Sequence, residues 1–175
     1  MIDTQFEKIR AHDIVGIRVI ISPEEMTELF DRGFREIVTL LKEEGVAPAG
    51  PARAYYFGEI SDTVDILIGF PVSQPGAEAL RRGALSQSGG NIDDVALHHF
   101  REMKTIHRRH SGTAEEVDRT WREILDEAEE HGCRLPAVSI GWEEFSGERA
   151  RVHPSGEAVT EVFVQVCQLP SIEPV

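Results

Sequence analysis

The sequence contains few cysteines and none of the common signatures of enzymes. Its 175 residues include only two cysteines, Cys133 and Cys167, which is too few for a disulfide framework or a zinc motif. A phosphate-binding loop, a dinucleotide fingerprint and a nucleophile elbow are also absent. We therefore expect a protein without a metal or a cofactor, in a reducing compartment such as the cytoplasm.

Positive charge is scarce as well. Lys and Arg number 18 against 31 Asp and Glu, so the formal net charge is −13. Nucleic-acid binding requires clustered basic side chains, and we therefore expect no direct contact with DNA or RNA. A negative field of this kind modestly favours cationic over anionic ligands.

Long hydrophobic stretches are missing. No apolar run is long enough to span a bilayer, and the N-terminus lacks the basic and apolar segments of a signal peptide. The hydrophobic content of 41% is that of a globular protein, and the length suits one domain over residues 1–175. We expect a single cytoplasmic domain that does not contact membranes.

The sequence does contain an internal repeat. Each half begins with a β-rich segment, continues with an apolar-periodic helix, and ends with two further β-rich segments. Capping boxes begin the helices, at Ser22-Pro23-Glu24-Glu25 and at Thr113-Ala114-Glu115-Glu116, and Gly45 and Gly132 end them. The half-repeats cover about residues 14–72 and 95–167, and residues 73–94 form the linker.

Two β-α-β-β units predict an α+β fold. We expect one curved antiparallel sheet with two helices on one side and a cleft along a pseudo-twofold axis. The linker is rich in Gly, Ser, Pro and Gln, which predicts a loop with at most a turn of helix at 79–83. Residues 95–109 are expected to form one long strand.

An acidic residue occupies the centre of the predicted cleft. Aligning the two glycines that end the helices places Tyr56 opposite Glu143, in a segment that is otherwise largely apolar. Because side chains alternate along a strand, Glu143 shares a face with Phe145, while Trp142 and Glu144 share the other. We expect Glu143 to point inward with a pKa raised by burial, unless it is exposed or paired with an arginine.

Aromatic residues gather in the segments that border the predicted axis. A pocket of aromatic rings around one carboxylate suits a lipophilic cation, because it combines cation–π attraction with a counter-charge. Any one of these rings could instead belong to the core. The aromatic residues concerned are Tyr55, Tyr56, Phe57, Phe70, Trp121, Trp142, Phe145 and Phe163.

Four histidines, His98, His99, His107 and His110, lie close together in the sequence. In one continuous strand, alternation would place His98 and His110 on one face and His99 and His107 on the other. No cluster of cysteines or acids complements either pair. We therefore expect no metal site.

At these residues the chain resembles the GyrI-like small-molecule-binding domain, the effector-binding domain of multidrug-responsive transcription regulators. The resemblance runs from about Ile14 to Val166, and the order and spacing of its pieces are more specific than any one piece. The matching pieces are Gly50-Pro51 with Ala54 and Tyr56, Val64-Asp65, Gly69-Phe70-Pro71-Val72, His110-Ser111-Gly112, Trp142-Glu143 with Phe145, and Thr160-Glu161-Val162-Phe163-Val164.

The resemblance implies a central cleft for lipophilic, often cationic or aromatic compounds, with Glu143 as the cleft acid of the family's Glu-x-Tyr pattern. Here Phe145 replaces the tyrosine, so its hydroxyl is lost. No helix-turn-helix precedes the domain, and we expect a stand-alone module that does not itself read DNA. The candidate ligand-binding residues are Glu143, Tyr56, Phe145, Trp142, Trp121, Phe70, Tyr55, His110 and Phe163.

These features leave two main functions open. The first, which we favour, is binding of a lipophilic cationic or aromatic small molecule for sensing or sequestration. The alternative is a hydrolase of electrophilic, cyclopropane-type compounds, in which Glu143 would be catalytic and activate water. Contact with a macromolecule such as gyrase is a third hypothesis, and a protein partner or a homodimer is left open.

Overall fold

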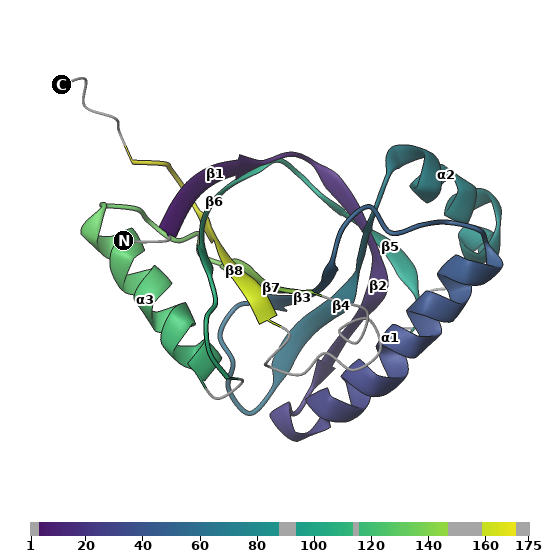
Figure 1. Ribbon diagram of the computed structural model, residues 1–175, viewed down its shortest axis with the longest axis horizontal. Coiled ribbons are helices and arrows are strands. Elements are labelled where there is room, and N and C mark those ends of the chain that lie inside the picture. Colours follow the sequence, from purple (N-terminus) through teal and green to yellow (C-terminus); the bar gives the residue numbers. More distant parts are fainter. Residues whose placement is uncertain (1–3, 88–93, 114–115, 147–158, 171–175) are drawn as a thin grey trace.

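The computed structural model describes residues 4–87, 94–113, 116–146 and 159–170, which form an eight-stranded antiparallel sheet with helices outside it (Figure 1). The strands are β1 (Thr4–Ile9), β2 (His12–Ile21), β3 (Ala52–Phe57), β4 (Val64–Val72), β5 (Ala96–Phe100), β6 (Met103–Arg109), β7 (Ile140–Phe145) and β8 (Val159–Val166). The α-helices are α1 (Met26–Glu43), α2 (Gln74–Arg82) and α3 (Val117–Glu130), and Pro23–Glu25 and Ala84–Gln87 form 3-10 turns. The predicted α+β fold with a curved antiparallel sheet is confirmed.

The sheet is symmetric in its topology. The strand order is β1-β6-β8-β7-β3-β4-β2-β5. If each of β1–β4 is exchanged with its counterpart in β5–β8 (β1 with β5, β2 with β6, and so on), the same order is obtained from the other end. The pair at the centre is β3 and β7, in which Tyr55 lies opposite Trp142. In Figure 1, α1 packs outside β2 and β4, and α3 packs outside β6 and β8. A pseudo-twofold axis therefore passes between β3 and β7.

Local signals in the sequence account for the two long helices. The Ser22 and Thr113 amides donate to the carboxylates of Glu25 and Glu116, at 2.8 and 2.7 Å, as a capping box requires. Gly45 and Gly132 end the helices with φ values of 65° and 68°, a conformation that most side chains resist. The apolar stripe of α1 is buried against the sheet at Leu29, Gly33, Phe34, Ile37 and Leu41.

The structure corrects the prediction at the edges of the sheet. The strand β1 was not predicted, and it pairs with β6. Residues 95–109 do not form one strand, because the chain breaks at Arg101-Glu102 between β5, which pairs with β2, and β6, which pairs with β1 and β8. Part of the predicted linker loop is the helix α2, whose N-cap Ser73 accepts a hydrogen bond from the Gly76 amide at 3.2 Å.

The break at Arg101-Glu102 also changes the predicted placement of the histidines. His98 pairs with Ile14 on β2, and His107 pairs with Phe163 on β8. Ile14 and Phe163 belong to one buried cluster, so His98 and His107 share a face of the sheet. The prediction that they lie on opposite faces is wrong, because side chains do not alternate through Arg101-Glu102, and Phe100 and Met103, three positions apart, lie in the same buried cluster.

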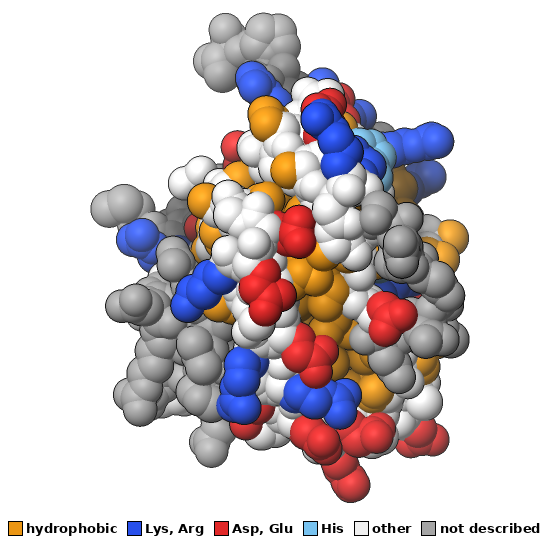
Figure 2. Space-filling model, turned by 90° about the vertical axis from the view of Figure 1, so that its right-hand side faces the viewer, with side chains coloured by type: hydrophobic (Ala, Val, Ile, Leu, Met, Phe, Trp, Pro, Cys, Tyr) orange, Lys and Arg blue, Asp and Glu red, His pale blue; other side chains and the backbone are white. Residues whose placement is uncertain are grey.

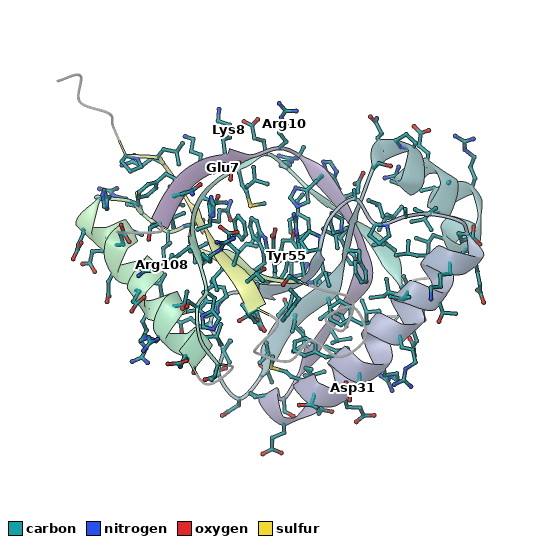
Figure 3. The ribbon with its side chains drawn as sticks, viewed as in Figure 1. Glu7, Lys8, Arg10, Asp31, Tyr55 and Arg108 are labelled. Carbon is teal, nitrogen blue, oxygen red and sulfur yellow. The ribbon has the colours of Figure 1, made fainter. Side chains whose placement is uncertain are left out.

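The two faces of the sheet are packed differently. We call the side covered by α1 and α3 the helix face, and it carries Ala54, Tyr56 and Glu143 among its buried residues. The opposite side, here called the inner face, carries a separate cluster around Tyr55 and Trp142. In Figure 3 the Tyr55 side chain lies inside the curve of the sheet.

Charged side chains cover the outer surfaces of the helices. On α1, Arg32 lies 4.0 Å from Glu28 and 3.8 Å from Glu36, and on the far side Arg108 of β6 pairs with Glu123 of α3 at 3.2 Å. Figure 2 shows this mixture of acidic and basic side chains on the α1 and α2 side of the molecule, with hydrophobic atoms visible between them. Within the described residues, no helix combines the length and apolar character needed to cross a membrane.

Candidate functional site

Glu143 lies on the helix face of β7, next to the pseudo-twofold axis. Its side chain is buried, and the residue is only 7% exposed. One carboxylate oxygen accepts a hydrogen bond from Trp121 Nε1 of α3 at 2.9 Å, and the other accepts one from the Tyr56 hydroxyl of β3 at 3.4 Å. The carboxylate is therefore held by one residue from each half of the chain.

The contact between Tyr56 and Glu143 is the one that the repeat predicted. The two residues are 87 positions apart in the sequence, and each lies next to the central pair of Tyr55 and Trp142. Side-chain alternation places both on the helix face. The predicted placement of Tyr56 against Glu143 is confirmed by their hydrogen bond.

Burial dominates the electrostatics of this carboxyl. Burial raises the pKa of Glu143 to about 7, the hydrogen bonds from Trp121 and Tyr56 lower it, and the negative charge of Asp118 raises it. Burial together with the Glu143 charge holds the pKa of Tyr56 well above its usual 10, so this hydroxyl remains a proton donor. Among the described residues, no Lys, Arg or His forms an ion pair with Glu143.

A glycine allows Trp121 to reach the carboxylate. A Cβ atom at Gly141 would lie 2.5 Å from Cζ3 of the Trp121 ring, which is closer than real side chains approach. The Trp121 ring also meets the Tyr56 ring edge to face, with centroids 6.0 Å apart. Gly141 thus lets the indole approach β7 closely, with its N–H donating to Glu143.

Towards α1, aromatic rings pack beneath the helix, beginning with Phe145, two residues along β7 from Glu143. Phe145 is buried and meets Phe30 and Phe34 of α1 edge to face, with centroids 6.1 and 6.3 Å apart. Phe34 in turn contacts Phe70 of β4 at 5.7 Å. Phe145 and Phe70 therefore belong to the apolar packing beneath α1, and the hydroxyl that donates to Glu143 comes from Tyr56.

Three of the candidate residues lie on the inner face, across the sheet from Glu143. The Tyr55 and Trp142 rings stack with centroids 5.1 Å apart, and Trp142 and Phe163 stack at 4.7 Å. The Tyr55 hydroxyl accepts from Arg53 Nη1 at 2.9 Å and lies 3.0 Å from His12 Nε2. Because Tyr55, Trp142 and Phe163 are turned away from Glu143, the structure does not bring them together with Tyr56 and Trp121.

His110 is buried at the start of the segment that leads into α3. Its Nδ1 lies 2.8 Å from the Thr120 hydroxyl, and its Nε2 lies 3.2 Å from the Thr113 carbonyl oxygen. Both ring nitrogens are thus engaged in holding the N-terminal end of α3 against β6. Among the described residues, no three His, Cys, Asp or Glu side chains are arranged to hold a metal ion.

The sequence analysis missed two contributors to the site. Asp118 precedes Trp121 by one turn of α3, so helical spacing could have placed it near the carboxylate. Phe30 belongs to the apolar stripe of α1, but only the packed structure shows that it meets Phe145. The buried candidates that meet at the site are Glu143, Tyr56 and Phe145, with the half-buried Trp121 at its edge.

Comparison with known proteins supports the fold. No protein-family model matches the sequence, and no curated protein matches it. SAV2435, solved with bound tetraphenylphosphonium, has a TM-score of 0.61 at 12% identity, covering 93% of each chain. The EcmrR C-terminal domain has a TM-score of 0.62 at 12% identity, covering 97% of this chain and 99% of that one.

A third solved structure, a hydrolase from Listeria innocua, has a TM-score of 0.58 at 14% identity, covering 94% of this chain and 91% of that one. Identities this low establish the fold and leave the ligand of this chain to be argued from its own residues. The chain thus has the fold that its resemblance to a GyrI-like small-molecule-binding domain predicted.

Proposed function

We propose that the protein binds lipophilic organic cations on the helix face, with Glu143 as their counter-charge. The observation that carries the proposal is the carboxylate of a residue that is 7% exposed, whose hydrogen-bond partners among the described residues are two neutral donors. An ionised group in such a place is costly unless a charge of opposite sign joins it. A bound organic cation would supply that charge.

The surroundings of Glu143 favour a cation that is also apolar. Tyr56 and Trp121 present aromatic rings beside the carboxylate, and such rings attract cations through their faces. Asp118 adds a second negative charge, whose effect is felt at both Glu143 and Tyr56. The solved structure of SAV2435 with tetraphenylphosphonium supports this class of ligand for a protein of the same fold.

Entry of a ligand requires Trp121 to move. Its indole is half-buried, lies against Gly141 and covers the carboxylate of Glu143. Rotation of this one side chain would break a single hydrogen bond and expose Glu143 from the α3 side. A cation would then offset the charge that the lost N–H donor had stabilised.

A hydrolase is the second candidate function, and one observation favours it. The pKa of Glu143, about 7, suits a general base that accepts a proton from water near neutral pH. The Tyr56 hydroxyl, at 3.4 Å from the carboxylate, could orient a water in place of the hydroxyl that Phe145 lacks. The hydrolase from Listeria innocua supports this alternative through its fold alone.

Calorimetric titration with tetraphenylphosphonium and with neutral triphenylphosphine oxide tests the proposal. We expect Glu143→Gln to weaken binding of the cation about 30-fold or more, the cost of removing one charge from a buried pair, and to leave binding of the neutral compound nearly unchanged. Glu129→Gln, an exposed acid on α3, is the matched control and should bind both compounds like the wild type.

If Glu143→Gln lost affinity equally for the cation and for the neutral compound, Glu143 would not be the counter-charge of the ligand. Mass spectrometry of the recovered ligands separates the two candidate functions. An unchanged mass supports binding, whereas an electrophilic compound returned with one added water, and only by the protein that retains Glu143, identifies a hydrolase.

A further inference from the structure

The two flanks of α3 differ in how their acidic side chains are paired. The flank towards the edge of the sheet carries Glu123 and Glu127, and both pair with Arg108 of β6, at 3.2 and 3.7 Å. The other flank carries Trp121, whose indole N–H donates to Glu143 of β7 at 2.9 Å. Figure 1 shows α3 to one side of the central strands β3 and β7. Side chains on the flank of Trp121 therefore face the proposed cation site.

Asp118 and Leu125 lie on the same flank as Trp121. They precede and follow it by three and four residues, and side chains with this spacing are neighbours along one side of a helix. Asp118 is half-buried. Leu125 is 38% exposed, although most large apolar side chains of the described residues are covered. The flank therefore presents an acid, an aromatic ring and an aliphatic side chain in line.

Asp118 contributes negative charge to the neighbourhood of Glu143. Its charge acts on Glu143 and on the Tyr56 hydroxyl, and it raises the pKa of both groups. Tyr56 and Glu143 are themselves in contact at 3.4 Å. The neighbourhood thus holds two carboxylates at different depths, with Glu143 buried beneath the Trp121 indole and Asp118 nearer the solvent.

Neither of these two acids has a cationic partner among the described residues. Arg122, one turn beyond Asp118, directs its Nε to the backbone carbonyl of Asp118 at 3.3 Å, and no ion pair joins its guanidinium to the carboxylate. On the inner face, by contrast, the half-buried Glu144 pairs with Arg53 at 3.1 Å. Two neighbouring negative charges repel each other, and a ligand with one positive charge offsets only one of them.

We propose that the cation site prefers lipophilic dications, with one cationic centre at Glu143 and the second at Asp118. This inference rests on the proposed function and specifies its class of ligand. The first centre would lie against the Glu143 carboxylate once Trp121 moves aside, and the second would lie against Asp118. The apolar body between the centres would pack along Leu125 and the aromatic rings of the site. A monocation would leave Asp118 without a partner.

Calorimetric titration of the full chain with ethidium and propidium tests this preference. The two dyes share one phenanthridinium ring system, and propidium carries a second, quaternary ammonium centre on a propyl chain. We expect the wild type to bind propidium more tightly than ethidium. Asp118→Asn should weaken propidium about three- to fivefold, the value of one partly exposed charge pair, and should weaken ethidium less. The readout is therefore the ratio of the two affinities.

Asp126→Asn is the matched control. Asp126 is an exposed aspartate of the same helix, and its replacement changes the net charge by the same amount. This variant should keep the wild-type ratio, which separates a contact at Asp118 from a general effect of charge. Asp118 also lies in the first turn of α3, where a carboxylate stabilises the helix. If that were its only role, Asp118→Asn would lower the melting temperature and leave the ratio unchanged.

Glu143→Gln separates this inference from the function on which it rests. If Glu143→Gln weakened both dyes strongly while Asp118→Asn behaved like Asp126→Asn, the cation site would stand and the dication preference would be wrong. A wild type that binds tetraphenylphosphonium, but binds propidium no better than ethidium, would also overturn the preference alone, even if Asp118→Asn did not fold. If the wild type bound neither dye nor tetraphenylphosphonium, or if Glu143→Gln bound all three like the wild type, the proposed function would fail together with this inference.

Discussion

The two faces of the central strand pair, β3 and β7, differ in how their charged groups are paired. On the inner face, Tyr55 and Trp142 are fully buried and stacked, and the Tyr55 hydroxyl has partners in Arg53 and His12. On the helix face, one residue along each strand, Tyr56 and Glu143 are also buried, but the carboxylate has no cationic partner among the described residues. On the inner face Arg53 pairs with Glu144 at 3.1 Å, whereas the buried carboxylate of the helix face has no such partner among the described residues.

The same comparison explains why the site is asymmetric about the pseudo-twofold axis. Tyr56 and Glu143 occupy corresponding positions in the two halves. Two glutamates there would repel each other, and two tyrosines would provide no charge. One of each gives a single carboxylate with a hydroxyl donor facing it across the axis, at 3.4 Å.

The largest difference between the faces should appear in stability when the two tryptophans are compared. We expect Trp142→Ala to reduce the free energy of unfolding by about 3–5 kcal/mol, because it empties a fully buried site between Tyr55 and Phe163. Trp121→Ala should reduce it by only about 1–2 kcal/mol, since this ring is half-exposed. Urea unfolding measures both values, and equal losses would contradict the assignment of packing to the inner face.

Replacing the helix-face acid should instead stabilise the protein at high pH. The folded-state pKa of Glu143, about 7, exceeds its reference value of 4.5, so the folded state binds more protons between these values. Stability therefore falls as the pH rises through this window and levels off above pH 7. We expect Glu143→Gln to exceed the wild type by about 3 kcal/mol at pH 8 and to match it near pH 4.5. Urea unfolding at the two pH values measures this difference, with Glu129→Gln as the control. A difference between Glu143→Gln and the wild type that is the same at both pH values would contradict the prediction.

Binding of a cation on the helix face should depend on pH. Tetraphenylphosphonium requires the ionised form of Glu143, so its affinity should fall about tenfold for each pH unit below 7 and remain constant above. Titrations between pH 5.5 and 8.5 would measure this dependence. If the affinity of Glu143→Gln for tetraphenylphosphonium depended on pH as strongly as that of the wild type, the titrating group would be another residue.

The smallest expected effect concerns Gly141. A methyl group at this position would displace the Trp121 ring, which a Cβ would approach to 2.5 Å. Gly141→Ala should therefore remove the hydrogen bond from Trp121 to Glu143, cost about 1 kcal/mol, and raise the pKa of Glu143 further. Carboxyl carbon NMR of the glutamates would follow that pKa, and an unshifted Glu143 titration would show that the indole N–H is not a significant donor.

Much of the fold was predictable because its signals are local. The capping boxes at Ser22 and Thr113 and the glycines Gly45 and Gly132 mark the helices without reference to distant residues. The edge strand β1 was missed because its burial pattern mixes exposed and half-buried residues and lacks a buried apolar face. Edge positions depend on the strand they pair with, and β1 pairs with β6, about 100 residues away in the sequence.

The candidate site was predictable only in part, for a similar reason. The alignment of the repeats identified Glu143 and Tyr56 as neighbours, and alternation placed Phe145 with them. The sequence around Trp121 does not show that this side chain reaches Glu143 from α3. The contact depends on Gly141, which has no side chain to block the indole. The single-domain organisation, with half-repeats at about residues 14–72 and 95–167, stays a prediction.

The sequence by itself determined the alternation of β7, which separates Glu143 from Trp142, and the acidic excess of the chain. These follow from bond geometry and composition, which no later packing can change. Only the tertiary structure decided that Glu143 is buried with no cationic partner among the described residues, and that Arg101 and His98 border a cavity on the other face. Burial and charge pairing depend on residues distant in sequence, and these set the pKa of Glu143 and hence its chemistry.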